Sequence, residues 1–293
     1  MNIVGMIPAR LGSTRVKNKE YFNKNDFTES DLKYYEPPSI EIMKKNNIKG
    51  KYFFSVAPRR DWFVDNSKNL VEMDRVFGGW SKKCANLTKK VLSIVCKRLH
   101  EASSYKISEL VKSFENSYRH VDIAMANQLS LAFPNLDVRE ALKLVGTKWN
   151  IGTFYPGFGS GGYCIPVSSK YILTGSKRSN KLSILKEAVK VDNSINILIA
   201  KSIIKRKIKK VGIFGLSYKE NLKVFALSPV IPFVKYLQKN DVNCSLFDPY
   251  YSKQEIKKIL NIGTFDLGSV SKFDCIVYHV NHSKFSSKKA MIL

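Results

Sequence analysis

The sequence predicts an α/β protein with a helical centre and a doubly wound parallel sheet towards its C-terminal end. Apolar residues recur at spacings of three and four over long central stretches, as they do in amphipathic helices. The last third of the chain instead alternates short, continuous apolar runs with a helical segment, which is typical of buried parallel strands. With 293 residues, 44% of them hydrophobic, the chain can build about two domains with real cores.

The chain is strongly basic, with 49 Lys and Arg against 24 Asp and Glu and a net charge of +25. The excess is mostly lysine spread along the whole length, which favours a solvated surface over one nucleic-acid-binding stripe, so we expect no nucleic-acid partner. No apolar run approaches the ~18–20 residues of a membrane span. With no readable signal peptide and five cysteines without a CxxC pair, we expect a soluble cytoplasmic protein.

The first fifty residues predict little regular structure. Residues 2–7 read as a short strand that turns into the basic, glycine-containing loop 8–15, whose backbone N–H groups and arginines suit phosphate. Residues 18–51 are polar and contain Pro37-Pro38, so they predict a connector. The aromatic and β-branched residues of 52–56 then predict a buried strand.

Four helices are predicted for the centre, two of them long. Helices of that length often connect domains or form dimer interfaces, and ordinary packing within one chain explains the pattern equally well. The predicted helices are 82–102 with Ser81 as its cap, 107–129 ending near Pro134, a short helix from Asp137 to about Gly146, and 181–207.

The C-terminal part predicts three buried strands and one helix between them. Because the strands read as parallel, we expect ligands at their carboxyl ends. The strands are 211–216, 244–247 and 274–278, and the helix is 229–238.

The segment 154–167 is rich in glycine, and a cysteine, Cys164, follows the glycines. Gly157, Gly159 and Gly162 match the spacing GxGxxG, but a proline precedes them where a strand is needed and Cys164 and Pro166 follow where a helix is needed. The glycines permit close approach of backbone to a ligand, and they present Cys164 as a candidate nucleophile. The remaining cysteines are expected to be small buried hydrophobes: Cys84, Cys96, Cys244 and Cys275.

A cysteine nucleophile needs donors that hold an oxyanion. Lys112 and Asn116 lie four residues apart, so they project from one face of the predicted helix, a cation beside an amide. Read alone, such a pair is usually solvated surface. We expect both to lie near Cys164.

Several ordered motifs resemble the UDP-glucose/GDP-mannose dehydrogenase family over about residues 51–285. The run 109–119 is similar to its Glu-Leu-x-Lys-x-x-Glu-Asn signature, and 156–167 is similar to its catalytic loop, in the Cys-Ile-Pro-Val form of the branch acting on UDP-N-acetylhexosamines. Three later motifs fit its nucleotide-sugar domain: 215–219, Ser228-Pro229 and Asp248-Pro249.

The resemblance implies oxidation of a sugar C6 alcohol to a carboxylate with two NAD molecules, in surface polysaccharide biosynthesis. Cys164 would attack the intermediate aldehyde, giving a thiohemiacetal and then a thioester, while Lys112 and Asn116 would stabilise the oxyanion and position water. The substrate side would be formed by Phe154, Tyr155, Gly157, Gly159 and Lys219. The long helices would form a homodimer.

The chain also departs from the family pattern. Ser168 replaces an acid four residues after the cysteine, Arg59 replaces another acid, and Tyr163 stands where histidine is usual. Residues 223–226 lack an expected arginine, and no N-terminal GxGxxG strand-turn-helix is found. The alternative function is therefore an impaired remnant that binds nucleotide sugar or dimerises without turnover.

The implied domains are a remnant of the NAD-binding domain over 1–80, a helical dimerisation domain over 81–207 and a nucleotide-sugar-binding domain over 208–293, which stops before the last expected strands. Residues 7–19 resemble the start of acylneuraminate cytidylyltransferases, over that stretch alone. The cofactor-binding residues are not identified. His279 and His282 lack a third ligand nearby, so we expect no metal.

Overall fold

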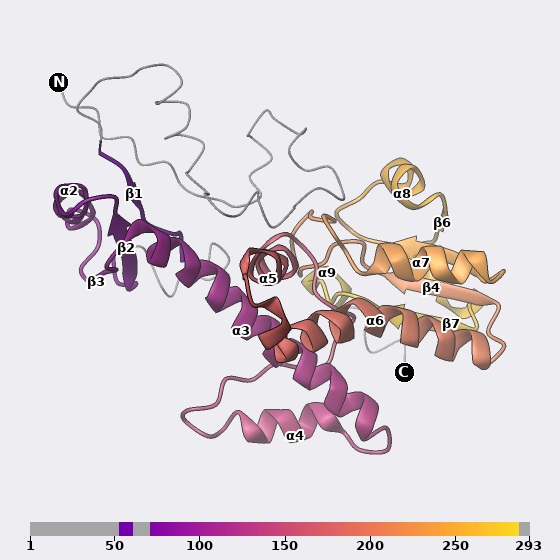
Figure 1. Cartoon of the computed structure of the whole chain (residues 1–293). Helices are drawn as coiled ribbons and strands as arrows, with labels where there is room; N and C mark the ends of the chain where they lie inside the picture. Colours follow the sequence, from indigo (N-terminus) through magenta and orange to yellow (C-terminus); the bar gives the residue numbers. More distant parts are fainter. Residues whose placement is uncertain (1–52, 61–70, 287–293) are drawn as a thin grey trace. The chain divides into compact units, whose positions relative to one another are not determined.

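The computed structural model describes residues 53–60 and 71–286 (Figure 1). The strand, basic loop and connector predicted for the first fifty residues lie outside this part. The chain forms two compact units, and each is described by itself. Unit 1 comprises 1–117 and 168–181, and unit 2 comprises 118–167 and 182–293.

Unit 1 contains a three-stranded sheet with the order β1-β2-β3. Strand β1 (Ser55–Val56) pairs antiparallel with β2 (Arg75–Gly79), and β2 pairs parallel with β3 (Leu99–Glu101). Helix α2 (Lys82–Leu92) connects the two parallel strands. The fully buried Phe77 of β2 packs against the apolar face of α2 and forms the core of this sheet.

The predicted helix 82–102 is wrong in its second half, because the chain turns after Leu92 and enters β3. Pairing of β3 with β2 outweighs the helix propensity of these residues. Ser81 does cap α2, since its hydroxyl accepts a hydrogen bond from the backbone N–H of Cys84. Strand β2 itself was not predicted.

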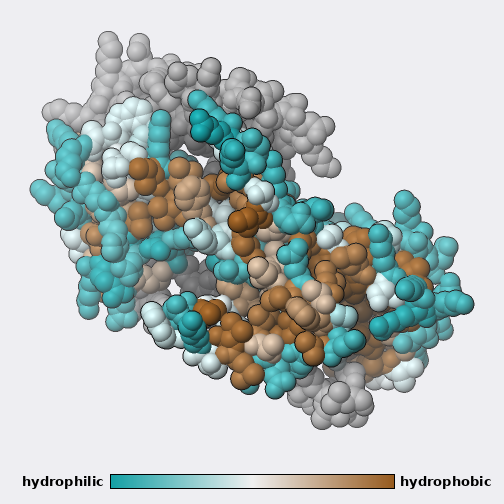
Figure 2. Space-filling model, turned by 60° about the horizontal axis from the view of Figure 1, so that its bottom comes forward, coloured by the Kyte–Doolittle hydropathy of each residue, from teal (hydrophilic) through white to brown (hydrophobic). Residues whose placement is uncertain are grey.

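The long helix predicted over 107–129 is confirmed as α3 (Tyr105–Ala132). Its first turns belong to unit 1, where Ser108 Oγ donates a 2.9 Å hydrogen bond to the carbonyl oxygen of Val56. A stripe of apolar side chains at helical spacing lies open to solvent along α3: Ile107, Leu110, Phe114, Tyr118 and Met125. Figure 2 shows further apolar side chains, in brown, exposed on the face that it presents.

The remaining helices of the centre are α4 (Val138–Val145), α5 (Cys164–Gly175), the short η2 (Ser179–Lys181) and α6 (Ser183–Lys205). Asp137 caps α4 as predicted, because its carboxylate accepts a hydrogen bond from the N–H of Glu140. Helices α3 and α6 pack through small side chains, with Ala124 facing Ala188 and Val191.

Unit 2 also contains a four-stranded, fully parallel sheet with the order β6-β5-β4-β7, so the doubly wound prediction is confirmed (Figure 1). The chain moves outward from β4 to β6 and then returns to place β7 on the other side of β4. Its elements are β4 (Lys210–Phe214), α7 (Val230–Lys239), β5 (Asn243–Phe247), α8 (Lys253–Leu260), β6 (Gly263–Thr264), η3 (Leu267–Lys272), β7 (Cys275–Tyr278) and α9 (Ser283–Ser286).

Both faces of this sheet are covered, as parallel sheets require. Val211 and Ile213 of β4 join a large aliphatic core with residues of α6, α7 and α8. Phe214, the next residue along, belongs to an aromatic core on the other face with Phe265 and Phe285. Gly212 also faces this second core, where an added Cβ would lie 2.7 Å from the Ile276 side chain.

A buried carboxylate organises the loop after β4. Asp248, just past β5, accepts hydrogen bonds from the N–H groups of Leu216 and Ser217 through Oδ2 and from that of Tyr250 through Oδ1. His282 Nδ1 accepts from the N–H of Asn221, so its Nε2 carries the proton that faces Asp248 at 3.2 Å. Burial opposes ionisation of Asp248, but these hydrogen bonds outweigh it and lower its pKa.

Both histidines that follow β7 contact groups within the fold, His282 through Asp248 and His279 through the Gly215 carbonyl. His282 is fully buried, and the described residues contain no cluster of His, Cys, Asp and Glu that could hold a metal. Cys84, Cys96 and Cys244 are buried as predicted, whereas Cys275 is only half-buried. Among the helices of the described part, none is long and apolar enough to cross a bilayer.

The buried ring of His279 should make the stability of the fold depend on pH. Its Nδ1 donates to the Gly215 carbonyl, and burial lowers its pKa from 6.5 to about 4. Between these values the unfolded chain binds the extra proton more tightly, so stability is complete above pH 6.5 and decreases towards pH 4. The decrease is at most about 3 kcal/mol, because each pKa unit corresponds to about 1.4 kcal/mol and the ring keeps some solvent contact.

We expect His279→Asn to keep a donor for Gly215 and to flatten this part of the pH profile. The free energy of unfolding, measured by denaturant titration between pH 4 and 7, checks the prediction. The exposed His100 is the control, and His100→Asn should leave the decrease in place. An equally steep profile in both variants would show that His279 does not cause it.

Candidate functional site

Cys164 is the first residue of α5, and its side chain is exposed. The irregular loop 151–163 leads directly into it. The prediction that no helix follows the glycines is wrong: α5 starts at the cysteine and accommodates Pro166 in its first turn, where a missing N–H costs nothing. The thiol therefore lies at a helix N-terminus, where the helix dipole favours negative charge.

Three backbone N–H groups of this loop donate hydrogen bonds to groups from three other segments of unit 2. Gly157 N–H donates to Asn127 Oδ1 of α3, and Ser160 N–H donates to Asp192 Oδ1 of α6, each at 2.8 Å. Gly162 N–H donates to the carbonyl of Ala226 between β4 and α7, also at 2.8 Å. The loop leading to Cys164 is thus held from both helices and from the C-terminal sheet region.

Sequence reasoning missed Asn127 and Asp192, although a signal for them exists. Asn127 is fully buried and Asp192 is 4% exposed, although both side chains are polar. Buried polar side chains need partners, so they mark a structural or functional contact. Asp192 also has His120 Nε2 3.2 Å from its Oδ2, a pair buried at both ends.

Two glycines of the loop are required by its geometry. Gly159 has φ +107°, and an added Cβ would lie 2.9 Å from the Asp192 carbonyl oxygen. Gly162 has φ +74°, and a Cβ there would lie 2.6 Å from the Tyr218 ring. Phe158, just before Gly159, packs edge-on against Phe233, with ring centroids 4.7 Å apart.

Positive charge gathers near the thiol. Burial lowers the pKa of Lys219, the neighbouring guanidinium of Arg119 lowers it further, and the charge of Cys164 acts in the opposite direction. Lys219 follows β4 on the loop organised by Asp248. The glycine loop approaches the loop that carries Lys219, because a Cβ on Gly162, two residues before Cys164, would lie 2.6 Å from the ring of Tyr218, the residue before Lys219.

The carboxyl ends of β4 and β7 mark where a ligand of the C-terminal sheet is expected. The chain reverses its direction of travel across the sheet between these two strands, and ligands of open parallel sheets bind at such a switch point. Gly215, with φ +96°, begins the loop after β4, and a Cβ there would lie 2.2 Å from Val280 after β7. Lys219 lies on that same loop.

Lys112 and Asn116 belong to unit 1, so their predicted approach to Cys164 stays a prediction. Within unit 1, the Nδ2 of buried Asn116 donates a 2.9 Å hydrogen bond to Ser168 Oγ. Ser168 lies one turn after Cys164 along α5. Lys112 is partly exposed, with its Nζ 3.9 Å from Glu115 Oε2, while Arg60 Nε contacts the other oxygen of Glu115 at 2.6 Å.

The remaining predicted substrate residues all belong to unit 2. Phe154 is half-buried, Gly157 is exposed, and Arg139 lies over the ring of Tyr155, 5.3 Å from its centroid. Arg139 Nη2 also donates to the carbonyl of Pro156 at 2.8 Å. Their role towards a sugar stays a prediction.

The described part of unit 1 does not fit a dinucleotide. Its one parallel strand-helix-strand turn contains Gly78 and Gly79, and both face the chain's own backbone. A Cβ on Gly78 would lie 2.3 Å from the Ser104 carbonyl oxygen, and one on Gly79 would lie 2.4 Å from the Ala85 nitrogen. No room is left there for a pyrophosphate to approach these glycines. The acid at the end of β3, Glu101, is paired with Lys82 at 2.7 Å.

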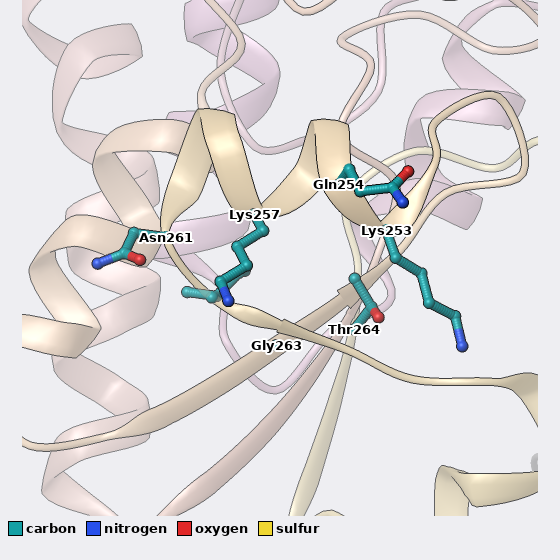
Figure 3. Close-up of a pocket in the computed structure, with 7 residues that line it drawn as sticks. Lys253, Gln254, Lys257, Asn261, Gly263 and Thr264 are labelled. Atoms are coloured by element: carbon teal, nitrogen blue, oxygen red, sulfur yellow. The ribbon is translucent and has the colours of Figure 1, made fainter.

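A separate hollow of about 460 Å³ lies at the edge of the C-terminal sheet, between α8 and β6 (Figure 3). It is lined by Lys253, Gln254, Lys257, Asn261, Ile262, Gly263 and Thr264. It contains no cysteine and none of the candidate site residues, so we do not assign the chemistry to it.

Comparison with known proteins identifies both halves of the described chain. Residues 106–194 match the family model for the central domain of the UDP-glucose/GDP-mannose dehydrogenase family, and residues 212–292 match the model for its UDP binding domain.

Three relatives illustrate the likeness. A UDP-N-acetyl-D-mannosamine dehydrogenase of Methanococcus aeolicus is 29% identical over 84% of this chain and 56% of its own. A UDP-N-acetyl-D-glucosamine 6-dehydrogenase of Salmonella typhi is 26% identical over 85% of this chain and 61% of its own. The solved structure of a UDP-D-ManNAc dehydrogenase from Pyrococcus horikoshii superimposes with a TM-score of 0.72 and 26% identity, over 85% of this chain and 60% of that one.

The chain thus spans about three fifths of the length of these relatives. The two matched models follow each other in family order, and the parallel sheet and long helices of the structure agree with them. The chain therefore belongs to the UDP-glucose/GDP-mannose dehydrogenase family.

Proposed function

We propose that this protein oxidises the C6 alcohol of a UDP-N-acetylhexosamine to a carboxylate, with Cys164 as the nucleophile and NAD as the oxidant. The observation that carries the proposal is the exposed thiol at the start of α5, placed after a loop fixed from three segments and near the cation Lys219. The names of the relatives support the substrate class.

The chain's own residues divide the chemistry. The Cys164 sulfur attacks the C6 aldehyde, a carbon–sulfur bond forms, and the carbonyl oxygen becomes an oxyanion. Lys112 and Asn116 stabilise this oxyanion, because a cation and an amide donor offer the complementary charge. After oxidation of the adduct to a thioester, water releases the acid and the free thiol. Phe154, Tyr155, Gly157 and Gly159 line the sugar side.

NAD supplies hydride acceptance to this reaction when bound. Gly78 and Gly79 face backbone, so they would not hold its pyrophosphate. The UDP group belongs at the carboxyl ends of β4 and β7, where Lys219 can meet the diphosphate. The product, a UDP-linked uronic acid, would serve surface polysaccharide synthesis. All five cysteines are free thiols, which supports a reducing cytoplasm.

Lys219→Ala tests the UDP site. We expect UDP to bind about tenfold more weakly, because a charge-assisted contact to phosphate is lost. Isothermal titration calorimetry with UDP measures the change. Lys239→Ala is the matched control, because Lys239 ends α7 and so lies near the amino ends of the parallel strands, away from their carboxyl ends. Equal affinities for both variants would contradict the assignment of Lys219.

A second function is favoured by three observations. Asn116 already donates to the hydroxyl of Ser168, which supplies no carboxylate base, and Gly78 and Gly79 offer no cradle for a dinucleotide. Arg59, where the resemblance implies an acid, is an exposed cation. A protein with these features would bind UDP-sugar or dimerise without turnover.

The rate of NADH formation separates the two functions. With UDP-N-acetylglucosamine and NAD we expect slow formation of NADH, because Ser168 supplies no carboxylate base, and no NADH at all would favour the second function. Ser168→Asp should raise the rate about tenfold or more, because a positioned base contributes at least about two orders of magnitude in many enzymes. Adding Cys164→Ala to that variant should abolish the gain.

Thr174→Asp is the matched control, because it adds the same single negative charge to an exposed position of α5. A gain in the control equal to that of Ser168→Asp would exclude a specific role for position 168. UDP binding without NADH from any variant would establish the non-catalytic function.

We also propose a homodimer formed through α3. Its exposed apolar stripe includes Tyr118 at 76% and Met125 at 55% exposure, and a monomer in water rarely leaves such a stripe uncovered. A second copy covers it with the same surface, as twofold interfaces do.

Met125→Lys with Tyr118→Lys should convert the dimer to a monomer, because dimerisation would bury two unpaired cations from each copy in the interface. Sedimentation equilibrium at micromolar concentration measures the mass. Val95→Lys, at an exposed apolar position in the connection between α2 and β3, should leave the dimer intact. A monomeric wild-type chain, or an unchanged dimer in the double variant, would disprove this interface.

A further inference from the structure

The loop 151–163 cannot fix its own conformation through hydrogen bonds within its backbone. It contains no helix or strand, yet it must deliver Cys164 to one place at the start of α5. Backbone N–H groups removed from water need acceptors, and an irregular loop finds them in other segments. Its conformation therefore depends on the groups that accept from it.

Asn127 and Asp192 are the side chains that do so. They reach Gly157 and Ser160 from positions 30 and 32 residues away in the sequence, and each accepts at 2.8 Å. Asn127 is fully buried, and its Nδ2 has no hydrogen-bond partner among the described residues. The contact with Gly157 is thus the one that the structure shows for its amide oxygen, and it explains a polar residue in the core.

Asp192 is restrained in turn. While Oδ1 accepts from Ser160, Oδ2 lies 3.2 Å from His120 Nε2, and both side chains are almost completely buried. The carbonyl of Asp192 also lies against Gly159, where a Cβ would lie 2.9 Å from it. A single residue of α6, Asp192, therefore contacts two successive loop residues, Gly159 through its carbonyl and Ser160 through its side chain.

We propose that Asn127 and Asp192 are positioning residues that hold the glycine loop and so place the Cys164 thiol, with His120 orienting the Asp192 carboxylate. The placing of the loop stands on the hydrogen bonds above; its benefit to the sugar chemistry rests on the proposed function. Neither side chain contacts a reacting atom in this account. Loss of either should disturb the thiol without disturbing the UDP site.

Hydrogen–deuterium exchange of the full chain measures the first part. In Asp192→Ala and Asn127→Ala, we expect the peptide that covers 157–163 to exchange about fivefold faster, since one hydrogen bond to its backbone is lost. Asp192→Asn keeps an oxygen acceptor for Ser160 and should restore slow exchange. Asn196→Ala is the matched control, because Asn196 is buried one turn further along α6 and its side-chain oxygen has no partner in the described part.

Alkylation of Cys164 by iodoacetamide measures the second part. We expect UDP-N-acetylglucosamine to slow the reaction in the wild type and in Asp192→Asn but not in Asp192→Ala. Cys275, half-buried in β7, is the internal reference in the same digest. UDP affinity by calorimetry should stay the same in all three proteins, because the positioning residues lie outside the loop after β4.

The outcomes separate the two ideas. Wild-type exchange in both alanine variants would overturn the positioning role, and so would fast exchange in Asp192→Asn, since the retained acceptor should suffice. Full protection of Cys164 in Asp192→Ala would also overturn it. A wild type that neither binds UDP nor protects Cys164 would instead refute the proposed function, while the exchange experiment would still decide whether the two side chains hold the loop.

Discussion

The candidate site depends on buried side-chain oxygens that accept hydrogen bonds from irregular backbone. Its two loops have no ladder of their own, so their N–H groups are satisfied by Asn127 and Asp192 in one case and by Asp248 in the other. Burying a carboxylate is costly unless several donors surround it. Asp248 meets that condition with three N–H groups and His282, and its lowered pKa is the consequence. Rigid loops are what these buried acceptors provide.

The same constraint explains the glycines that the chain keeps. Gly159 lets the loop approach the backbone of α6, and Gly162 lets it approach the Tyr218 ring. By contrast, Gly78 and Gly79 approach the chain's own backbone and leave no space for a ligand. Glycine spacing alone cannot distinguish these situations, because it does not reveal what lies opposite the missing side chain. Only glycines that face the chain's own backbone, such as Gly78 and Gly79, argue against a bound dinucleotide.

One departure from the family pattern lies where a base would act. Ser168 accepts the amide proton of Asn116, so a neutral hydrogen bond occupies the place where the resemblance implies a carboxylate. The thiol, the loop acceptors and Lys219 are nevertheless all present within one compact unit. An exposed thiol and a nearby loop cation without a carboxylate at position 168 are what make the two proposed functions separable by experiment.

The sequence by itself determined the fold class, the long helices, the parallel strands and the family, because periodicity and ordered motifs are local properties. It also predicted Cys164 and Lys219, whose neighbours in the chain are distinctive. It failed for β3, where pairing with β2 outweighed helix propensity, and for the start of α5. Asn127, Asp192 and His120 could not be assigned roles, since their partners lie 30 or more residues away. Only the tertiary structure decided those contacts, because a hydrogen bond between distant segments exists only once packing has brought them together.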